Sequence, residues 1–268
     1  MPALELRHRR ADGESLAPRP AAVTEETGRL DGRLAWARLP GSGPGVVFLP
    51  GYRSDMQGSK ALALRDHCAA SGQALLRFDY SGHGESAGRF EDGTIGQWAA
   101  DAIAVFDALT EGPQILIGSS MGGWIALLLA RARPERIAGL IGIAPAPDFT
   151  ETLMWPAFTE EQRAEIMAKG VLDLPSQYGE PTPVTRALIE DGRRHNVLDA
   201  PIPLACPVRI LQGMRDPDVP WQHALKLVDA IVGEDVRLHL IKDGDHRLSR
   251  PEDLRLLAET LDALRAQP

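Results

Sequence analysis

The sequence has few cysteines and no long apolar run. Two cysteines, Cys68 and Cys206, occur among 268 residues, and neither belongs to a Cys-x-x-Cys motif or a Cys/His cluster. This pattern argues against a disulfide or a zinc site, and it predicts free, buried thiols in a reducing compartment. The longest apolar stretch, residues 124–130, is far too short to cross a bilayer, so no membrane span is expected.

The sequence also lacks a block of positive charge. Lys and Arg number 29 against 37 Asp and Glu, which gives a formal net charge of −8, and the basic residues are interspersed with acidic ones. Such a surface neither follows the phosphates of nucleic acid nor attracts an anionic membrane. Nucleic acid is therefore not an expected partner. The remaining composition, 44% hydrophobic and 25% charged, is that of an ordinary globular protein.

The N-terminal residues lack the apolar core of a secretory signal. Residues 1–20 contain arginines, but Glu5, Asp12 and Glu14 lie among them, whereas a transit peptide is poor in acidic residues. We therefore expect a cytoplasmic protein in which residues 1–32 form an N-terminal tail with at most a first strand.

Short runs rich in Val, Ile and Leu alternate with helical patterns along the chain. The runs expected to be strands cover residues 45–49, 74–78, 115–117, 139–143, 208–211 and 236–241. The helical patterns cover residues 60–71, 94–109, 121–133, 221–232 and 251–265. Near-continuous apolar strands are typical of a parallel sheet buried on both faces, and the alternation predicts a doubly wound, mostly parallel α/β sheet.

The alternation breaks once, after the fourth expected strand. The stretch that follows is too long for one crossover helix, is rich in proline, and contains helical fragments at residues 160–169 and 183–194. A long excursion of this kind usually forms a functional cover or a binding segment. We expect one α/β core, residues 33–147 and 205–268, with a helical lid insertion over residues 148–204.

The motif Gly-x-Ser-x-Gly occurs at residues 118–122, where an expected strand meets an expected helix. In that context Ser120 lies on a tight turn, and Gly118 and Gly122 leave room for the neighbouring backbone. The hydroxyl of Ser120 then projects at the carboxyl edge of the sheet, where a nucleophile is needed. Ser119 occupies the x position, and we expect it to pack or hydrogen-bond locally.

A serine hydroxyl needs a positioned base, and the base needs a carboxylate to orient it. His246 follows the last expected strand and is the expected base, and Asp216 follows the strand before it and is the expected acid. Both lie beyond carboxyl ends of strands, in the chain order Ser, Asp, His. Asp218 is the alternative acid, although a solvated or turn-capping role fits it better.

Acyl transfer also needs hydrogen-bond donors for the oxyanion. One donor is expected to be the backbone N–H of Met121, at the start of the helix after Ser120. The second is expected from the loop after the strand at residues 45–49, where Gly51 permits a sharp turn and the N–H of Tyr52 is the candidate.

The lid insertion supplies the other candidate substrate contacts. His195 is the remaining histidine placed to reach a substrate, although such a histidine more often packs or caps a helix. Candidate walls of an acyl pocket are Leu153, Met154, Trp155, Phe158 and Met167. Each of these side chains has the alternative of only holding the insertion to the body.

These motifs together resemble the α/β-hydrolase superfamily over nearly the whole chain from about Arg33 onward. Its D-x-x-G-x-G-x-S turn is matched at residues 79–86, its G-x-x-D-x-x-V-P turn at 213–220, and Gly-Asp-His at 244–246. The match is closer still to a branch of mitochondrial abhydrolase-domain enzymes, palmitoyl-protein thioesterases and acyl-glucuronide esterases, and to their bacterial relatives. That likeness rests on the phrases LPGYRSDMQGSKALAL, RFDYSGHGES, GPQILIGSSMGGW, PIPLACPVRILQGMRDPDVPW and DGDHR.

The resemblance implies an α/β-hydrolase fold, a triad of Ser120, Asp216 and His246, and a carboxylic ester or thioester as substrate. The acyl group would be carried by a small molecule or by an acylated protein, and the reaction would need no cofactor and no metal ion. The same triad also serves peptidases, carbon–carbon hydrolases and acyltransferases, and a non-catalytic binding module is a further alternative. The mitochondrial location is not taken over, because the N-terminus is not a convincing acid-poor transit peptide, and the oligomeric state is left open.

Arg53 departs from that branch, which has an apolar residue at this place beside the oxyanion loop. If Arg53 faces the pocket, it would favour an anionic substrate. Otherwise it reaches solvent or pairs with Asp55.

Overall fold

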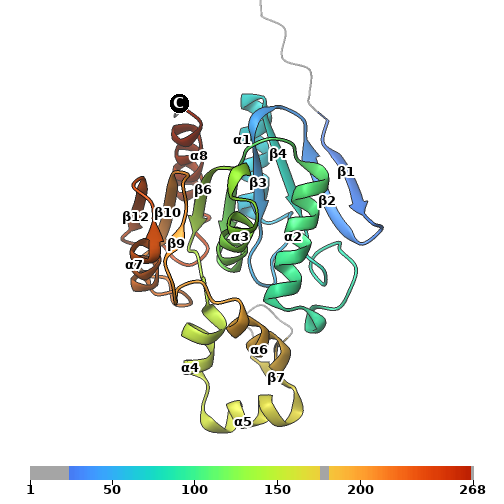
Figure 1. The fold of residues 1–268 in the computed structure, drawn as a ribbon, viewed down its shortest axis with the longest axis vertical. Helices are drawn as coiled ribbons and strands as arrows, with labels where there is room; N and C mark the ends of the chain where they lie inside the picture. The colour runs from blue at the N-terminus through green and yellow to red at the C-terminus, as the bar shows by residue number, and fades with distance from the viewer. Residues whose placement is uncertain (1–23, 176–180, 267–268) are drawn as a thin grey trace, which may run out of the picture.

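The computed structural model describes residues 24–175 and 181–266. Within these residues eight strands form a central sheet in the order β1-β2-β4-β3-β5-β6-β10-β12 (Figure 1). The strands are β1 (Glu26–Leu30), β2 (Leu34–Leu39), β3 (Ser42–Leu49), β4 (Gln73–Phe78), β5 (Gln114–Ser119), β6 (Ile137–Ile143), β10 (Val208–Gly213) and β12 (Val236–Ile241). The two pairs made by β2 are antiparallel and the other pairs of this sheet are parallel, so the sheet is mostly parallel.

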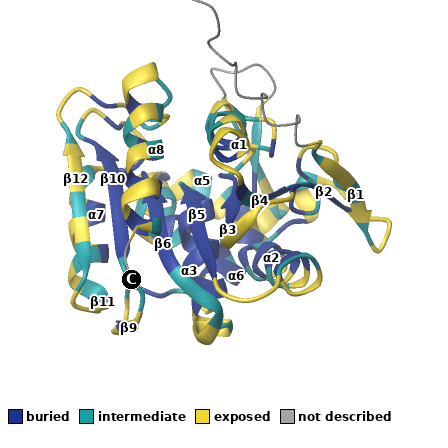
Figure 2. Cartoon of the chain, turned by 90° about the horizontal axis from the view of Figure 1, so that it is seen from above, coloured by how far each residue is buried: buried dark blue, intermediate teal, exposed yellow. Residues whose placement is uncertain are grey.

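Helices cover both faces of this sheet (Figure 2). They are α1 (Ser59–Ser71) and α8 (Pro251–Arg265) on one face, and α2 (Ile95–Leu109), α3 (Met121–Ala132) and α7 (Trp221–Ala230) on the other. Successive residues of a strand point to opposite faces, and in β3 Val46 joins the apolar layer under α1 and α8, whereas Val47 joins the layer under α2 and α3. The predicted doubly wound sheet is therefore confirmed.

Some boundaries differ from those expected. The helix expected at residues 221–232 ends at Ala230, and its last two residues form β11 (Ile231–Val232), which pairs with β9 (Ile202–Pro203). β2 was not expected, because its sequence, LAWARL, contains no β-branched residue. The expected N-terminal tail lies outside the described residues up to residue 23, and the first strand allowed there is β1.

After β6 the chain leaves the sheet, and its 148–204 segment lies beyond the edge at which β6 ends (Figure 1). The described elements of this segment are a π-helical turn (Thr150–Met154), α4 (Trp155–Ala157), α5 (Glu160–Lys169), β7 (Val171–Leu174), β8 (Thr182–Thr185), α6 (Arg186–Arg194) and β9. The helix expected at residues 183–194 is thus wrong at its start, where β8 pairs antiparallel with β7. The side chain of Thr185 accepts the N–H of Leu188 at 3.1 Å, and this N-cap sets the beginning of α6.

A buried aspartate joins the two ends of the 148–204 segment. Asp148 is 1% exposed, and its carboxylate accepts the backbone N–H of Val197 at 2.9 Å and that of Leu198 at 2.8 Å. Burial raises the pKa of Asp148, and the two N–H groups act in the opposite direction. The carbonyl of Pro147 accepts a hydrogen bond from Nε2 of His223 at 2.8 Å. We call residues 147–148 together with residues 197–198 the neck of the segment. Asp148 joins the two chains of the neck, and Pro147 attaches it to the body through His223.

Replacing Asp148 with alanine is expected to destabilise the protein by about 2–4 kcal/mol, because two buried N–H groups lose their acceptor. The measurement is the midpoint of urea unfolding at an unchanged m-value. Asp199→Ala is the matched control, because exposed Asp199 accepts a hydrogen bond from Asn196, and it should change the free energy of unfolding by less than about 0.5 kcal/mol. Equal losses in the two variants would contradict the role given to Asp148.

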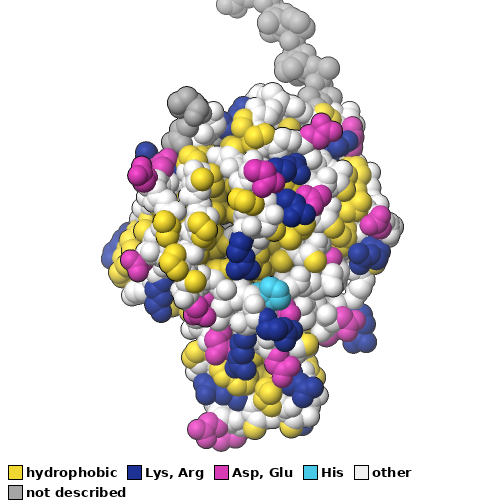
Figure 3. Space-filling model, viewed as in Figure 1, with side chains coloured by type: hydrophobic (Ala, Val, Ile, Leu, Met, Phe, Trp, Pro, Cys, Tyr) yellow, Lys and Arg dark blue, Asp and Glu magenta, His cyan; other side chains and the backbone are white. Residues whose placement is uncertain are grey.

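The cysteines of the protein are free and its charges are dispersed. Both thiols are free, as predicted, but only Cys68 is buried, and Cys206 is half-buried. Burial raises the pKa of both, that of Cys68 to about 12. On the face drawn in Figure 3, basic side chains lie among acidic ones. None of the described helices combines the length and the apolar character that crossing a membrane requires.

Candidate active site

Ser120 lies on the tight turn between β5 and α3. Its backbone has φ 54° and ψ −119°, a combination that strains a residue with a side chain. The N–H of Ser120 donates to the carbonyl of Ile143 at 2.9 Å. Its own carbonyl accepts the N–H of Gly123 at 2.9 Å and that of Ala146 at 3.0 Å. The end of β6 and the residues after it therefore help to hold the serine in its strained conformation.

Close backbone contacts require the two glycines of the motif. A Cβ on Gly118 would lie 2.3 Å from the carbonyl oxygen of Gly122, and a Cβ on Gly122 would lie 2.0 Å from that of Leu49. Both distances are far shorter than a van der Waals contact. Only glycine fits at these positions, and it lets α3 begin directly against the ends of β3 and β5.

The two loops that carry the predicted acid and base touch each other. A Cβ on Gly213, the last residue of β10, would lie 2.4 Å from the carbonyl oxygen of Gly244, and the N–H of Arg215 donates to that oxygen at 2.9 Å. Lys60 of α1 donates to the carbonyl of Arg247 at 2.5 Å, and burial lowers the pKa of Lys60 to about 8. Backbone contacts and one lysine thus fix the position of the second loop.

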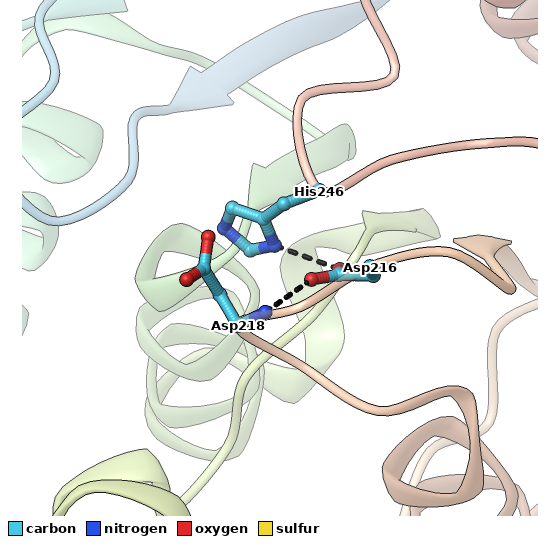
Figure 4. Close-up of side chains that lie close together, drawn as sticks. All are labelled: Asp216, Asp218 and His246. Carbon is cyan, nitrogen blue, oxygen red and sulfur yellow. Dashed lines mark hydrogen bonds and ion pairs between the residues drawn. The ribbon is translucent and has the colours of Figure 1, made fainter. Parts of the chain in front are cut away.

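Ser120, His246 and Asp216 form one hydrogen-bonded chain. Nε2 of His246 lies 3.1 Å from Oγ of Ser120. On the other side of the ring, Nδ1 of His246 lies 2.8 Å from Oδ2 of Asp216, and Figure 4 shows this second pair. Because a carboxylate only accepts hydrogen bonds, Nδ1 carries the proton and Nε2 accepts from the serine hydroxyl. The side chain of Asp216 is fully buried and that of His246 is 23% exposed. Ser119, by contrast, is the buried last residue of β5.

Asp216 is held by more groups than the sequence reveals. Its Oδ1 accepts the backbone N–H groups of Asp218 and Val219, each at 2.8 Å. Gln212, fully buried near the end of β10, donates its side-chain amide to Oδ2 of Asp216 at 3.1 Å and to the carbonyl of Val219 at 3.0 Å. Sequence reasoning missed Gln212, although a polar residue in an apolar strand four positions before the acid is a usable signal.

Asp218 lies at the surface beside this pair (Figure 4). Asp216, Asp218 and His246 each offer one ligand atom, and these atoms lie within 4.8 Å of one another, a spacing that would suit a metal ion. However, Oδ2 of Asp216 and Nδ1 of His246 are hydrogen-bonded to each other, and Oδ1 of Asp216 already accepts two N–H groups. This set of donors and acceptors fits an acid–base pair better than a metal site.

The loop after β3 lies directly beside Ser120. A Cβ on Gly51 would lie 3.3 Å from Cβ of Ser120, and Tyr52 is the next residue. Met121, the other predicted donor, begins α3 immediately after the serine. Three aromatic rings pack around that of Tyr52. Their centroids lie 4.9, 5.9 and 5.8 Å from the centroid of the tyrosine ring, and they belong to Phe90, Trp98 and Phe149. The backbone of both predicted oxyanion donors therefore lies next to the serine.

Tyr52 and Arg53 connect this loop with the 148–204 segment. The hydroxyl of Tyr52 donates to the carbonyl of Pro183 at 3.1 Å, and burial raises its pKa, so that it stays protonated. Arg53 is exposed, and its guanidinium donates to the carbonyl of Pro181 at 3.1 Å and to the hydroxyl of Thr182 at 2.7 Å. The structure thus places Arg53 at the surface, where the loop after β3 meets β8.

His195 lies between α6 and α2. Its Nδ1 donates to the carbonyl of Asp191 at 2.8 Å, and its ring lies against Gly96, where a Cβ would approach it to 2.6 Å. The carbonyl of His195 accepts the indole N–H of Trp124 at 3.1 Å, and the carboxylate of Asp191 accepts the N–H of Gly96 at 2.6 Å. The residue attaches the 148–204 segment to the body, which is the packing role that the sequence left open.

The candidate pocket walls are distributed between two apolar clusters. The guanidinium groups of Arg163 and Arg193 lie 5.5 and 4.9 Å from the centre of the Trp155 ring. Phe158 is buried in a small core within the 148–204 segment. Leu153 and Met154 pack against the apolar layer of the body. Met167 is 39% exposed. Most of these side chains therefore take part in holding the segment together or to the body.

Known proteins resemble this chain in both sequence and fold. A family model described as serine aminopeptidase, S33, matches residues 44–190, more than half of the chain. The Mus musculus protein named palmitoyl-protein thioesterase ABHD10, mitochondrial, is 46% identical over 233 residues, which are 86% of this chain and 78% of the relative. The chain belongs to the α/β hydrolases.

Two solved hydrolase structures agree with this assignment. A hydrolase from Agrobacterium vitis S4 has a TM-score of 0.84 and 46% identity, over 92% of this chain and 99% of its own. The mouse alpha/beta hydrolase domain-containing protein 10 has a TM-score of 0.82 and 43% identity, over 90% of this chain and 98% of its own. The predicted α/β-hydrolase fold and enzyme class are confirmed, and the hydrolase acts on carboxylic ester or thioester bonds.

The comparison corrects one prediction. We expected a cytoplasmic protein, but the relatives from mouse and human that match 86% of the chain are named as mitochondrial. The cytoplasmic prediction is wrong on this finding. It depended on acidic residues near the N-terminus, and the composition of one short segment is weaker ground than kinship over most of the chain.

Proposed function

We propose that Ser120, His246 and Asp216 form the catalytic triad of this hydrolase and that the reaction passes through an acyl-enzyme. The observation that carries the proposal is the pair of hydrogen bonds on either side of His246, 3.1 Å to Ser120 and 2.8 Å to Asp216. Both lie within the reach that proton transfer needs. The strained backbone of Ser120 is that of a nucleophile elbow.

In the proposed cycle, Ser120 attacks the acyl carbonyl while its proton passes to Nε2 of His246. Asp216 stabilises the imidazolium that forms, and the N–H groups of Tyr52 and Met121 donate to the oxyanion. His246 then protonates the leaving alcohol or thiol. Water attacks the acyl-enzyme by the same steps and returns Ser120 to its starting state.

The proposed substrate is an acyl thioester or ester, carried by a small molecule or by an acylated protein. The name of the mouse relative, a palmitoyl-protein thioesterase, supports a fatty acyl thioester. The 148–204 segment would act as a lid over a core of residues 33–147 and 205–268, because the oxyanion loop hydrogen-bonds to β8. Among the predicted substrate contacts, Arg53 lies at this junction and is the one we retain.

A second candidate function is the release of N-terminal amino acids from peptides. The matching family model is described as serine aminopeptidase, S33, and the same triad attacks an amide carbonyl as it attacks an ester. This function would require a group that binds the free amine of a peptide. The mouse thioesterase is 46% identical to this chain over 86% of the chain's length, and this likeness favours the ester and thioester reaction.

Hydrolysis assays on the purified protein distinguish the two functions. We expect it to hydrolyse p-nitrophenyl esters and acyl-thioesters, and comparison of short and long acyl chains identifies the preferred acyl group. A fluorophosphonate should abolish this activity and leave one adduct, found by mass spectrometry on the peptide that contains Ser120. Hydrolysis of amino-acid p-nitroanilides without ester cleavage would favour the aminopeptidase, and an adduct at another residue would contradict the triad.

A further inference from the structure

The loop that carries Tyr52 is attached to the turn at residues 79–86, a motif that the proposed triad does not use. Asp79 is buried, and its two carboxylate oxygens accept the N–H of Met56 at 2.7 Å and that of Glu85 at 2.8 Å. One carboxylate therefore joins the oxyanion loop to the turn.

His83 makes a second connection, to the residue directly after Tyr52. Its Nε2 accepts the backbone N–H of Arg53 at 3.3 Å, and its Nδ1 lies 3.3 Å from the carbonyl oxygen of Ser81. Because a carbonyl only accepts hydrogen bonds, Nδ1 carries a proton. The ring can then accept at Nε2 only while it is neutral.

The surroundings of His83 favour the neutral form. It is 3% exposed. The rings that contact it edge-on, with centroids at 5.6, 5.1 and 5.1 Å, are those of Tyr80, Phe90 and Trp98. Burial lowers the pKa of His83 below its usual range, and this outweighs the carbonyl of Ser81 and the carboxylates of Asp101 on α2 and Asp55 on the loop, which act in the opposite direction. Arg53 is the cation on the same loop.

Arg53 needs such a support because its backbone is left-handed. Its φ of 55° is strained for a residue with a side chain, and a strained conformation persists only where the surroundings fix it. The N–H of Arg53 belongs to the peptide that follows Tyr52. The acceptor on His83 therefore sets the direction of that peptide, and with it the path of the Tyr52 backbone beside Ser120.

We propose that His83 is a positioning residue of the oxyanion site: its neutral ring holds the loop so that the N–H of Tyr52 points at the oxyanion. The inference rests on the proposed function, since it takes Tyr52 as a donor. A protonated His83 would turn a second N–H toward the N–H of Arg53, and the loop would lose this support. Acid should therefore inactivate the hydrolase through His83.

His83→Leu removes the acceptor. It is expected to lower kcat for an activated ester about 10- to 100-fold with little change in KM, because oxyanion contacts strengthen in the transition state. The decisive measurement is the rate ratio between the ester and the matching thionoester, whose sulfur is a poor hydrogen-bond acceptor. That ratio should fall in His83→Leu. His223→Leu is the matched control, because His223 is also 3% exposed but bonds to the carbonyl of Pro147, and it should leave the ratio unchanged.

His83→Gln distinguishes the effect of the hydrogen bond to Arg53 from the effect of protonating the ring. The amide oxygen of glutamine can accept the N–H of Arg53 and does not take up a proton in this range. We expect kcat at neutral pH to return to within about threefold of the wild-type value. In the plot of log kcat/KM against pH, the acid limb should be less steep by one proton in His83→Gln than in the wild-type protein. An unchanged far-UV circular dichroism spectrum over the same pH range shows that unfolding does not contribute.

Two results would overturn the role of His83. One is an unchanged ratio of ester to thionoester rates in His83→Leu, and the other is an acid limb of equal steepness in the wild-type protein and His83→Gln. Failure of the proposed function looks different. In that case the fluorophosphonate leaves no adduct on Ser120 of the wild-type protein, whatever the His83 variants do.

Discussion

Ser120→Ala is expected to lower kcat for ester hydrolysis by about 10⁵- to 10⁶-fold, because loss of the nucleophile disables a triad about as fully as loss of all three members. The substitution removes one oxygen atom, the one that lies 3.1 Å from Nε2 of His246. Alanine meets the same backbone strain as serine at φ 54°, so the variant should stay folded. The measurements are steady-state hydrolysis of a p-nitrophenyl ester, fluorophosphonate labelling and the melting temperature.

Ser119→Ala is the matched control for this prediction. Both serines precede α3, but Ser119 is the last residue of β5 and is buried. Loss of the Ser119 hydroxyl should leave kcat within about threefold of the wild-type value, because a hydroxyl that takes no part in the reaction affects stability rather than rate. An active Ser120→Ala together with an inactive Ser119→Ala would reverse the assignment.

Asp216→Asn is expected to lower kcat by about 10⁴-fold, because an amide beside the catalytic histidine stabilises the wrong tautomer. Oδ2 of Asp216 accepts from His246 and Gln212, and Oδ1 accepts two backbone N–H groups. In either orientation of an asparagine side chain at this position, its NH₂ group therefore faces other hydrogen-bond donors. If the NH₂ group faces His246, Nδ1 must become the acceptor, and Nε2 then carries a proton and cannot take the one from Ser120. The pH profile of kcat and a melting curve complete the measurement.

Asp218→Asn distinguishes the two carboxylates that the sequence offered as the acid. Asp218 is exposed, and its backbone N–H rather than its side chain bonds to Asp216. The variant should lose less than about tenfold in kcat, since a solvated charge acts weakly on its neighbours. A loss as large as that of Asp216→Asn would show that the catalytic carboxylate had been misassigned.

The elbow and the two loops were predictable because their signals are local. Gly118 and Gly122 flank Ser120 within five residues, and the structure shows close backbone contacts at both glycines. The acid and base each follow an apolar strand, and parallel strands bring their carboxyl ends to one edge of the sheet. Strand order along the chain was therefore enough to bring Ser120, Asp216 and His246 together.

The supporting residues were not predictable in the same way. Asp148 acts through hydrogen bonds to groups that lie 49 and 50 residues away, and their position depends on the complete fold. Gln212 bonds to Asp216, only four residues away, and its polar side chain in an apolar strand was the one signal available. His83 lies in a glycine-rich turn, and nothing in the sequence shows that its ring reaches the N–H of Arg53. Polar side chains that bond to backbone carry no periodic pattern. β8 was missed because it is short and runs directly into α6, with Thr185 both ending the strand and capping the helix.

The attachment of the 148–204 segment by Asp148 makes this part of the chain exchangeable. Because the carboxylate of Asp148 binds the N–H groups of Val197 and Leu198, the outgoing and returning chains meet at one place beside the sheet. Each doubling of the length of a flexible loop costs only about 0.6 kcal/mol in closure entropy. A longer, shorter or differently folded segment can therefore be joined at the same neck while the strands that carry Ser120, Asp216 and His246 keep their places. Under the proposal that this segment covers the site, substrate range can change by replacing one segment, without altering the proposed triad.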